Sequence, residues 1–123
     1  MQVYYKVLTN DLKSVIMHSS PTRYRLGKWV TPYIPYSKLF VFDTLEHAES
    51  FRGRHVRSQV IYEVVVKNPI RIKKICYWST SNIKLKHFWK MRKNKKRCEH
   101  VVIIPALPGT VGCDAVKLLR RVS

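Results

Sequence analysis

The chain has 123 residues with a hydrophobic content of 46%, and its 24 Lys and Arg residues against 7 Asp and Glu give a formal net charge of +17. Its length suits a single domain, and an aromatic content of 11% argues against intrinsic disorder, which combines high net charge with few aromatic residues. No apolar run approaches the roughly eighteen residues that cross a bilayer, and the N-terminal stretch lacks the apolar core of a signal peptide. We therefore expect a folded cytoplasmic protein without a membrane partner.

The cysteine content argues against a disulfide scaffold. Cys76, Cys98 and Cys113 are odd in number and widely spaced, whereas secreted scaffolds carry an even and denser set. A zinc site would need nearby histidines, but the Cys-Glu-His spacing at residues 98–100 matches no usual ligand pair. The sequence therefore predicts free, buried or half-buried thiols, with no metal and no cofactor.

The first predicted elements are a strand and a long irregular stretch. Residues 2–8 alternate apolar and polar side chains with β-branched and aromatic types, which is typical of a strand. Residues 10–38 contain three prolines and a glycine and are predicted to be mostly loop. A short strand is expected there, at either 24–26 or 28–30.

A strand followed directly by a helix is predicted next. Residues 39–42 read LFVF, a compact apolar strand. Asp43 and Glu46 have the spacing of a capping box, in which Asp43 would be the N-cap. The helix is expected to end near Gly53, because glycine commonly follows the last helical turn.

The second half is predicted to add three strands and a helix before the C-terminal strand. Strands are expected at residues 60–66, 70–78 and 101–104, a helix at 83–93, and a last strand at 111–119. The elements follow no regular strand–helix alternation. The sequence therefore predicts one α+β domain over the whole chain, with about six mainly antiparallel strands and two helices.

Positive charge is concentrated in one part of the chain. Residues 64–97 hold twelve of the 24 Lys and Arg residues and no Asp or Glu. Gathering like charges costs self-repulsion, and a polyanion is the commonest partner that relieves it. We therefore expect residues 67–97 to form a basic segment that contacts such a partner.

The stretch 84–97, KLKHFWKMRKNKKR, carries the densest charge. A solvated helix would normally include Glu at i,i+4 positions from Lys, and the absence of carboxylates favours phosphate contact instead. Lysine outnumbers arginine in this stretch. Lysine suits contact with the phosphate backbone of a nucleic acid, whereas bidentate recognition of guanine favours arginine. The predicted nucleic-acid-binding residues are Lys84, Lys86, Phe88, Trp89, Lys90, Arg92, Lys93, Lys95, Lys96 and Arg97, together with Arg71, Lys73 and Lys74.

Residues 79–81, Ser-Thr-Ser after a predicted strand, resemble the motif of one class of ADP-ribosyltransferases. The resemblance implies an upstream arginine, Arg23 or Arg25, that grips the dinucleotide, and a downstream glutamate, Glu99. The family's glutamate belongs to an E-x-E or Q-x-E pair, whereas the Cys-Glu-His sequence here has no such partner. Capping of the predicted basic helix by Ser81 explains these residues without catalysis.

Two other titratable groups, His47 and Glu63, are candidates for an active site. His47 follows Asp43 by four residues, so a His–Asp pair is possible, but no convincing nucleophile stands beside it. Glu63 lies within an apolar strand and is predicted to be a satisfied or solvent-facing strand residue rather than a tuned acid. No catalytic residue is therefore assigned.

Three short stretches resemble small uncharacterised proteins encoded by bacteriophages. They are YYKVL at residues 4–8, GKWVTP at 27–32 and IYEVVV at 61–66. The chain departs from that pattern in its middle, LFVFDTLEHAESF, and in its basic half. The resemblance implies a viral or mobile-element origin and action inside a host cell, but no particular activity.

The sequence thus predicts a non-enzymatic protein that binds RNA, DNA or a nucleoprotein through phosphate contacts, in the host cytoplasm if it is viral. The first alternative is an inhibitor that occupies an acidic or nucleic-acid-binding surface of a host protein. The second is a divergent ADP-ribosyltransferase-like enzyme.

Overall fold

The computed structural model describes residues 2–14, 22–32, 38–52, 58–76 and 103–123, with backbone alone for 74–76 and 103–104. Within these ranges lie one helix, α1 (Leu45–Arg52), and nine strands. The strands are β1 (Tyr4–Thr9), β2 (Trp29–Val30), β3 (Leu39–Phe42), β4 (Gln59–Lys67), β5 (Ile70–Arg71), β6 (Lys74–Cys76), β7 (Ile103–Pro105), β8 (Thr110–Cys113) and β9 (Ala115–Arg121).

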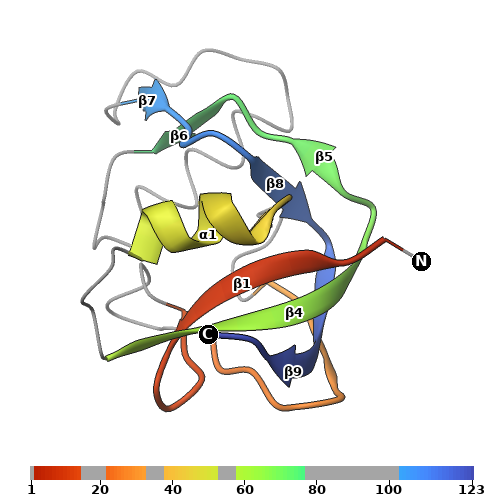
Figure 1. The fold of residues 1–123 in the computed structure, drawn as a ribbon. Helices are drawn as coiled ribbons and strands as arrows, with labels where there is room; N and C mark the ends of the chain where they lie inside the picture. The colour runs from red at the N-terminus through yellow and green to blue at the C-terminus, as the bar shows by residue number, and fades with distance from the viewer. Residues whose placement is uncertain (1, 15–21, 33–37, 53–57, 77–102) are drawn as a thin grey trace.

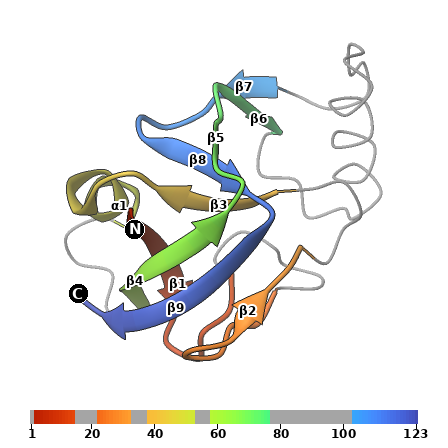
Figure 2. The same cartoon turned by 90° about the vertical axis from the view of Figure 1, so that its right-hand side faces the viewer.

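Seven of the strands form one antiparallel sheet, in the order β2-β9-β4-β1-β3-β8-β5 (Figure 1, with β2 and β3 labelled in Figure 2). The strands β6 and β7 pair separately. The predicted α+β class with a mainly antiparallel sheet is therefore confirmed. One helix lies in the described ranges, and the second predicted helix, at 83–93, lies outside them.

The sheet curls back on itself, so that β9 leads directly from β8 and β5 directly from β4. In the sheet β8 and β9 are separated by three strands, yet in the chain Asp114 alone joins them. The strands β4 and β5 are likewise joined by only Asn68 and Pro69. Backbone bonds continue through this corner, where Asp114 N donates to Lys67 O at 2.9 Å and Ile72 N donates to Thr110 O at 3.1 Å. Both chain segments therefore run across the corner as one bent two-stranded ribbon.

Side chains hold that corner in place. The Asp114 carboxylate accepts a bond from Lys38 Nζ and a second bond, at 2.9 Å, from Asn68 Nδ2. These hydrogen bonds hold the pKa of Asp114 below its ordinary value. Asn68 has a φ of 52°, a left-handed conformation that asparagine tolerates better than most residues.

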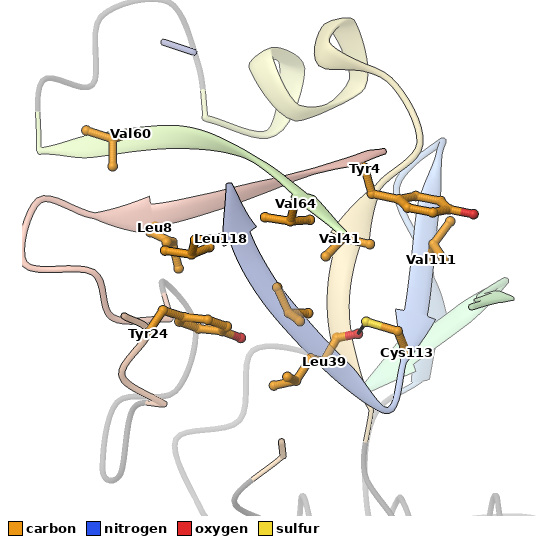
Figure 3. Close-up of a cluster of buried hydrophobic side chains, with 11 residues drawn as sticks. Tyr4, Leu8, Tyr24, Leu39, Val41, Val60, Val64, Val111, Cys113 and Leu118 are labelled. Carbon is orange, nitrogen blue, oxygen red and sulfur yellow. Dashed lines mark hydrogen bonds between the residues drawn. The ribbon is translucent and has the colours of Figure 1, made fainter. Parts of the chain in front are cut away.

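The main core lies inside the curl. Figure 3 shows buried side chains from β1, β3, β4, β8 and β9 converging there, together with Tyr24. They alternate with side chains on the outer face because successive strand residues point to opposite faces. The residues of this core are Tyr4, Leu8, Tyr24, Leu39, Val41, Val60, Val64, Val111, Cys113, Val116 and Leu118.

The helix α1 covers the other face of β1, β3 and β4 (Figure 1). Ala48 is fully buried against this face, where it packs with Phe42 and Ile61. The rings of Phe42 and Phe51 lie 5.3 Å apart between centroids, within the range of a favourable aromatic pair. A small second core therefore fixes the helix to the sheet.

The predicted helix cap is wrong by one residue. The helix begins at Leu45, and His47 N donates to Thr44 Oγ1 at 3.1 Å, so Thr44 is the N-cap. The Asp43 carboxylate instead bonds the His47 side chain. The capping box of Asp43 with Glu46 is therefore replaced by a threonine cap.

Two long predicted strands are broken in the structure. The predicted strand at 70–78 divides into β5 and β6, because Ile72 turns in to cover Gly112 and Ala106 N bonds to Lys73 O. The predicted strand at 111–119 divides into β8 and β9 at Asp114. The strands predicted at 2–8, 39–42 and 60–66 are confirmed with small changes of boundary, and the short strand expected before residue 31 is β2.

Candidate nucleic-acid interface

Most of the predicted binding residues lie outside the described ranges. This holds for the whole stretch 84–97, including Phe88 and Trp89, and for the Ser-Thr-Ser motif and Glu99. Of the remaining three, Lys73 is exposed, Arg71 lies on β5 and Lys74 begins β6. The described part of the basic segment is therefore its beginning, residues 67–76, on the short strands that follow the corner.

Arg71 belongs to a polar cluster at the start of α1. One of its guanidinium nitrogens donates to Asp43 Oδ2 at 3.0 Å, and His47 Nδ1 lies 2.6 Å from Asp43 Oδ1. Because the ionised carboxylate only accepts, Nδ1 carries the proton. Gly109 lies against this pair. A Cβ atom at this position would clash with the side chains of Asp43 and His47, and the φ of 80° also favours glycine.

The electrostatics of this cluster favour an ionised Asp43. Burial by itself would raise the pKa of the carboxyl group, but the bonds and charges of His47 and Arg71 outweigh it and hold the pKa below its ordinary 3.8. A carboxylate stabilised in this way orients the Arg71 guanidinium and the His47 ring. It is not tuned to exchange protons near neutral pH.

The described residues around this pair supply no nucleophile for a hydrolytic or transfer reaction. Two hydroxyl groups nearby are engaged in other bonds: Thr44 Oγ1 accepts from His47 N at 3.1 Å, and Thr110 Oγ1 donates its proton to Leu107 O at 2.6 Å. Glu63 is bonded to Arg120 at 3.2 Å, which confirms that it is a satisfied strand residue. Arg23 and Arg25, the arginines considered for dinucleotide binding, are both exposed.

The polar groups inside the curl are buried, and burial shifts their pKa values in the direction that favours the uncharged forms. Lys6 Nζ donates to Phe40 O at 2.6 Å, and burial lowers its pKa from 10.5 to about 8. Burial raises the pKa of Cys113, a free buried thiol as predicted, to about 12, and raises that of Tyr24 as well. Figure 3 shows the Tyr24 hydroxyl pointing into the core, and its interaction with the Ser14 side chain offsets part of the effect of burial on its pKa.

The outer surface of β2, β9 and β4 carries a group that the sequence did not single out. The Trp29 ring is 42% exposed, and two ammonium groups lie over it, Lys67 Nζ at 4.5 Å and Lys117 Nζ at 5.3 Å from its centroid. Each exposed contact of this kind is worth about 0.5–1 kcal/mol. The three residues are far apart in the sequence, so only strand pairing brings them together.

The charge balance of these three strands is positive. Among the residues of β2, β4 and β9, Glu63 is the one carboxylate, against the four cations Lys67, Lys117, Arg120 and Arg121. Glu63 is taken by Arg120, and in the described structure neither Lys67 nor Lys117 forms a salt bridge. An exposed aromatic ring beside two cations without a carboxylate partner in the described ranges is an arrangement that suits an anionic ligand with a flat group.

Neither a metal centre nor a membrane span is found in the described residues. No three His, Cys, Asp or Glu side chains there gather into a group able to hold a metal ion. The helix that they include is too short and too polar to cross a bilayer.

Comparison of the chain with protein-family models, curated proteins and solved structures gives no match. Its function is therefore inferred from its own residues and contacts.

Proposed function

We propose that the protein binds nucleic acid, either RNA or DNA, through contacts of lysine and arginine side chains with backbone phosphates, and that it acts by binding rather than by catalysis. The proposal depends chiefly on the twelve cations and the absence of any carboxylate in residues 64–97. Such a concentration raises the free energy of the isolated protein by self-repulsion. Phosphates neutralise it, and each neutralised phosphate also releases a counterion.

The described start of the segment supports this proposal. Lys67 and Lys73 are exposed, and Arg71 is exposed over 57% of its side chain although one of its nitrogens bonds Asp43. A guanidinium group carries five N–H donors in a fork, so Arg71 can retain Asp43 and still donate to a phosphate. The contact with Asp43 orients the group without using all of its donors.

The salt dependence of binding tests the proposal. We expect a labelled duplex, titrated by fluorescence anisotropy at several salt concentrations, to give a log–log slope of roughly −4.5 to −6, as five to seven phosphate contacts require. Reversal of four charges in the dense stretch should abolish binding without unfolding the protein. The variant replaces Lys93, Lys95, Lys96 and Arg97 by Glu.

A charge-matched control distinguishes the effect of positive charge clustered in the basic segment from the effect of the net charge of the whole protein. Replacing four cations outside the basic segment by Glu changes the net charge equally and should leave most of the binding intact; these are Lys13, Arg23, Arg25 and Arg52. No binding at low salt, or a slope near zero, would contradict the proposal. Stoichiometric retention of one host protein after nuclease treatment of a lysate is the result that the host-inhibitor alternative requires instead.

A further inference from the structure

We propose that Trp29, over whose ring Lys67 and Lys117 place their ammonium groups, is a stacking site for an unpaired base, so that the preferred ligand is a single-stranded nucleic acid. The inference rests on the proposed function and specifies the form of nucleic acid. It adds a second contact surface, on β2, β9 and β4, to the basic segment.

Strand register places the three side chains on one face. Trp29 lies directly opposite Lys117, and Lys67 lies opposite Ala115 on the same strand, β9. Directly paired residues of antiparallel strands point to the same face. Because Ala115 is small, the Lys67 side chain can cross β9 and place its ammonium group over the ring.

The position of the ring makes it accessible to a ligand. The strand β2 is an edge of the sheet (Figure 2), and Trp29 keeps 42% of its surface exposed there. Its indole ring is the largest flat apolar surface that the described residues expose, since the other exposed large hydrophobic residues are leucines and one isoleucine.

The two ammonium groups supply the charge that a nucleotide requires. Their distances to one ring centroid, 4.5 and 5.3 Å, place them within about 10 Å of each other, which is one Debye length at 0.1 M salt. They therefore repel each other and lack a carboxylate partner among the described residues. A base stacked on the ring would bring the phosphates on its two sides close to these cations.

Energetics favour the exchange of a lysine for a base. Base–aromatic stacking is stronger than an exposed cation–π contact, and the displaced ammonium group gains a phosphate in return. Bases within a duplex are already stacked and paired, so an edge-strand ring reaches them only by unstacking the helix. A single strand offers its bases without that cost.

Trp29 and the lysines also stabilise the two-residue strand β2, and a purely structural role has to be distinguished from stacking. An abasic single strand makes this distinction, since it presents the same phosphates without bases. The ratio of affinities for a base-containing and an abasic strand of equal length reports stacking alone. A loss of stability affects both affinities equally and leaves the ratio unchanged.

The experiment compares oligo(dT), oligo(U), abasic DNA of the same length and a DNA duplex by anisotropy at one salt concentration. We expect the wild-type protein to bind oligo(dT) or oligo(U) at least tenfold more tightly than the abasic strand. Trp29→Ile, which keeps a good strand former, should remove this preference and leave the affinity for the abasic strand unchanged. Leu107→Ala truncates a residue of similar exposure, 44% against 42%, on the turn before β8, and should retain the preference.

A second measurement avoids any effect of the Trp29 substitution on folding. In the double variant Trp78→Phe, Trp89→Phe, Trp29 is the remaining tryptophan of the three, and its fluorescence should be quenched by oligo(dT) and not by the abasic strand. Equal binding of base-containing and abasic strands, or a preference that survives Trp29→Ile, would overturn the stacking site and leave phosphate binding intact. Absence of binding to every probe would overturn the proposed function itself.

Discussion

Lys6 places an ammonium group inside the curl of the sheet, where only 9% of the residue is exposed. Its bond to Phe40 O and its position 5.6 Å from the Tyr24 ring centroid offset part of the cost of burial. Because desolvation disfavours the charged form, the pKa falls from 10.5 to about 8. This residue should therefore control how stability depends on pH above neutrality.

We predict that the free energy of unfolding rises between pH 8 and pH 9. In this window the folded protein loses the Lys6 proton while the unfolded chain, with a pKa of 10.5, keeps it, so the unfolded state binds more protons. Above pH 9 the rise should level off, and it should reverse only near pH 10, where the unfolded Tyr24 hydroxyl also ionises. The unfolded Cys113 thiol ionises at its ordinary pKa of 9.0, whereas in the folded protein its pKa is raised to about 12.

The variant Lys6→Met should lose this rise and gain on the order of 2–3 kcal/mol at pH 7, because the cost of burying a charge is removed. Urea denaturation followed by circular dichroism at half-unit pH steps measures both effects. Lys28→Met, at an exposed position, should behave as wild type. A Lys6→Met protein that is less stable than wild type at pH 7 would contradict the prediction.

At the scale of elements, α1 depends on its cap because it is only eight residues long. A helix of this length is not stable by itself in water, and it is held by packing of one face and by satisfaction of its first N–H groups. Thr44 accepts the bond from His47 N, and Ala48 and Phe51 pack against the sheet.

Thr44→Ala should lower the free energy of unfolding by about 1 kcal/mol, the usual cost of losing an N-cap side chain. Thr44→Ser retains the hydroxyl group and should keep most of the free energy of unfolding that Thr44→Ala loses. Glu46→Gln, which changes the residue of the initially predicted capping box, should have a much smaller effect. Thermal denaturation of the three variants ranks them, and a larger loss for Glu46→Gln than for Thr44→Ala would show that the cap is assigned incorrectly.

At the scale of the whole molecule, the sheet closes through the corner at Asp114. This residue joins two strands that have three other strands between them in the sheet, and its carboxylate is held by Lys38 and by Asn68. The corner also sets the position of Lys67, whose backbone carbonyl accepts the bond from Asp114 N. Stability and the placement of the Trp29 surface are therefore linked through it.

We predict that Asp114→Ala lowers the free energy of unfolding by about 1–2 kcal/mol, because it leaves Lys38 and Asn68 without their shared acceptor. Because the pKa of Asp114 lies below its ordinary 3.8 in the folded state, this difference should persist above pH 4 and shrink as the pH falls further. Glu49→Ala, at an exposed position on α1, should have little effect at either pH. Chemical denaturation at pH 7 and pH 3 provides the comparison.

The sequence by itself determined the local elements where periodicity was strong. The apolar alternation of β1, β3 and β4 predicted these strands because β-branched and aromatic residues at every second position fit a half-buried sheet. The proposed partner class also comes from the sequence, since net charge and its clustering need no coordinates. The predicted N-cap was wrong, because the role of a single residue depends on its contacts in the folded structure. Asp43 bonds the His47 side chain, and Thr44 caps the helix instead.

Only the tertiary structure decided the closure of the sheet and the surface around Trp29. Residues 111–119 read as one strand because Asp114 is a single polar residue in an apolar run, and its bonds to Lys38 and Asn68 are visible only after the chain has folded. Lys67, Lys117 and Trp29 likewise come together through pairing of three strands. The alternation of apolar residues along a strand shows which of its side chains face the core. It does not show which distant strand lies beside it or in what register, because long-range packing sets both.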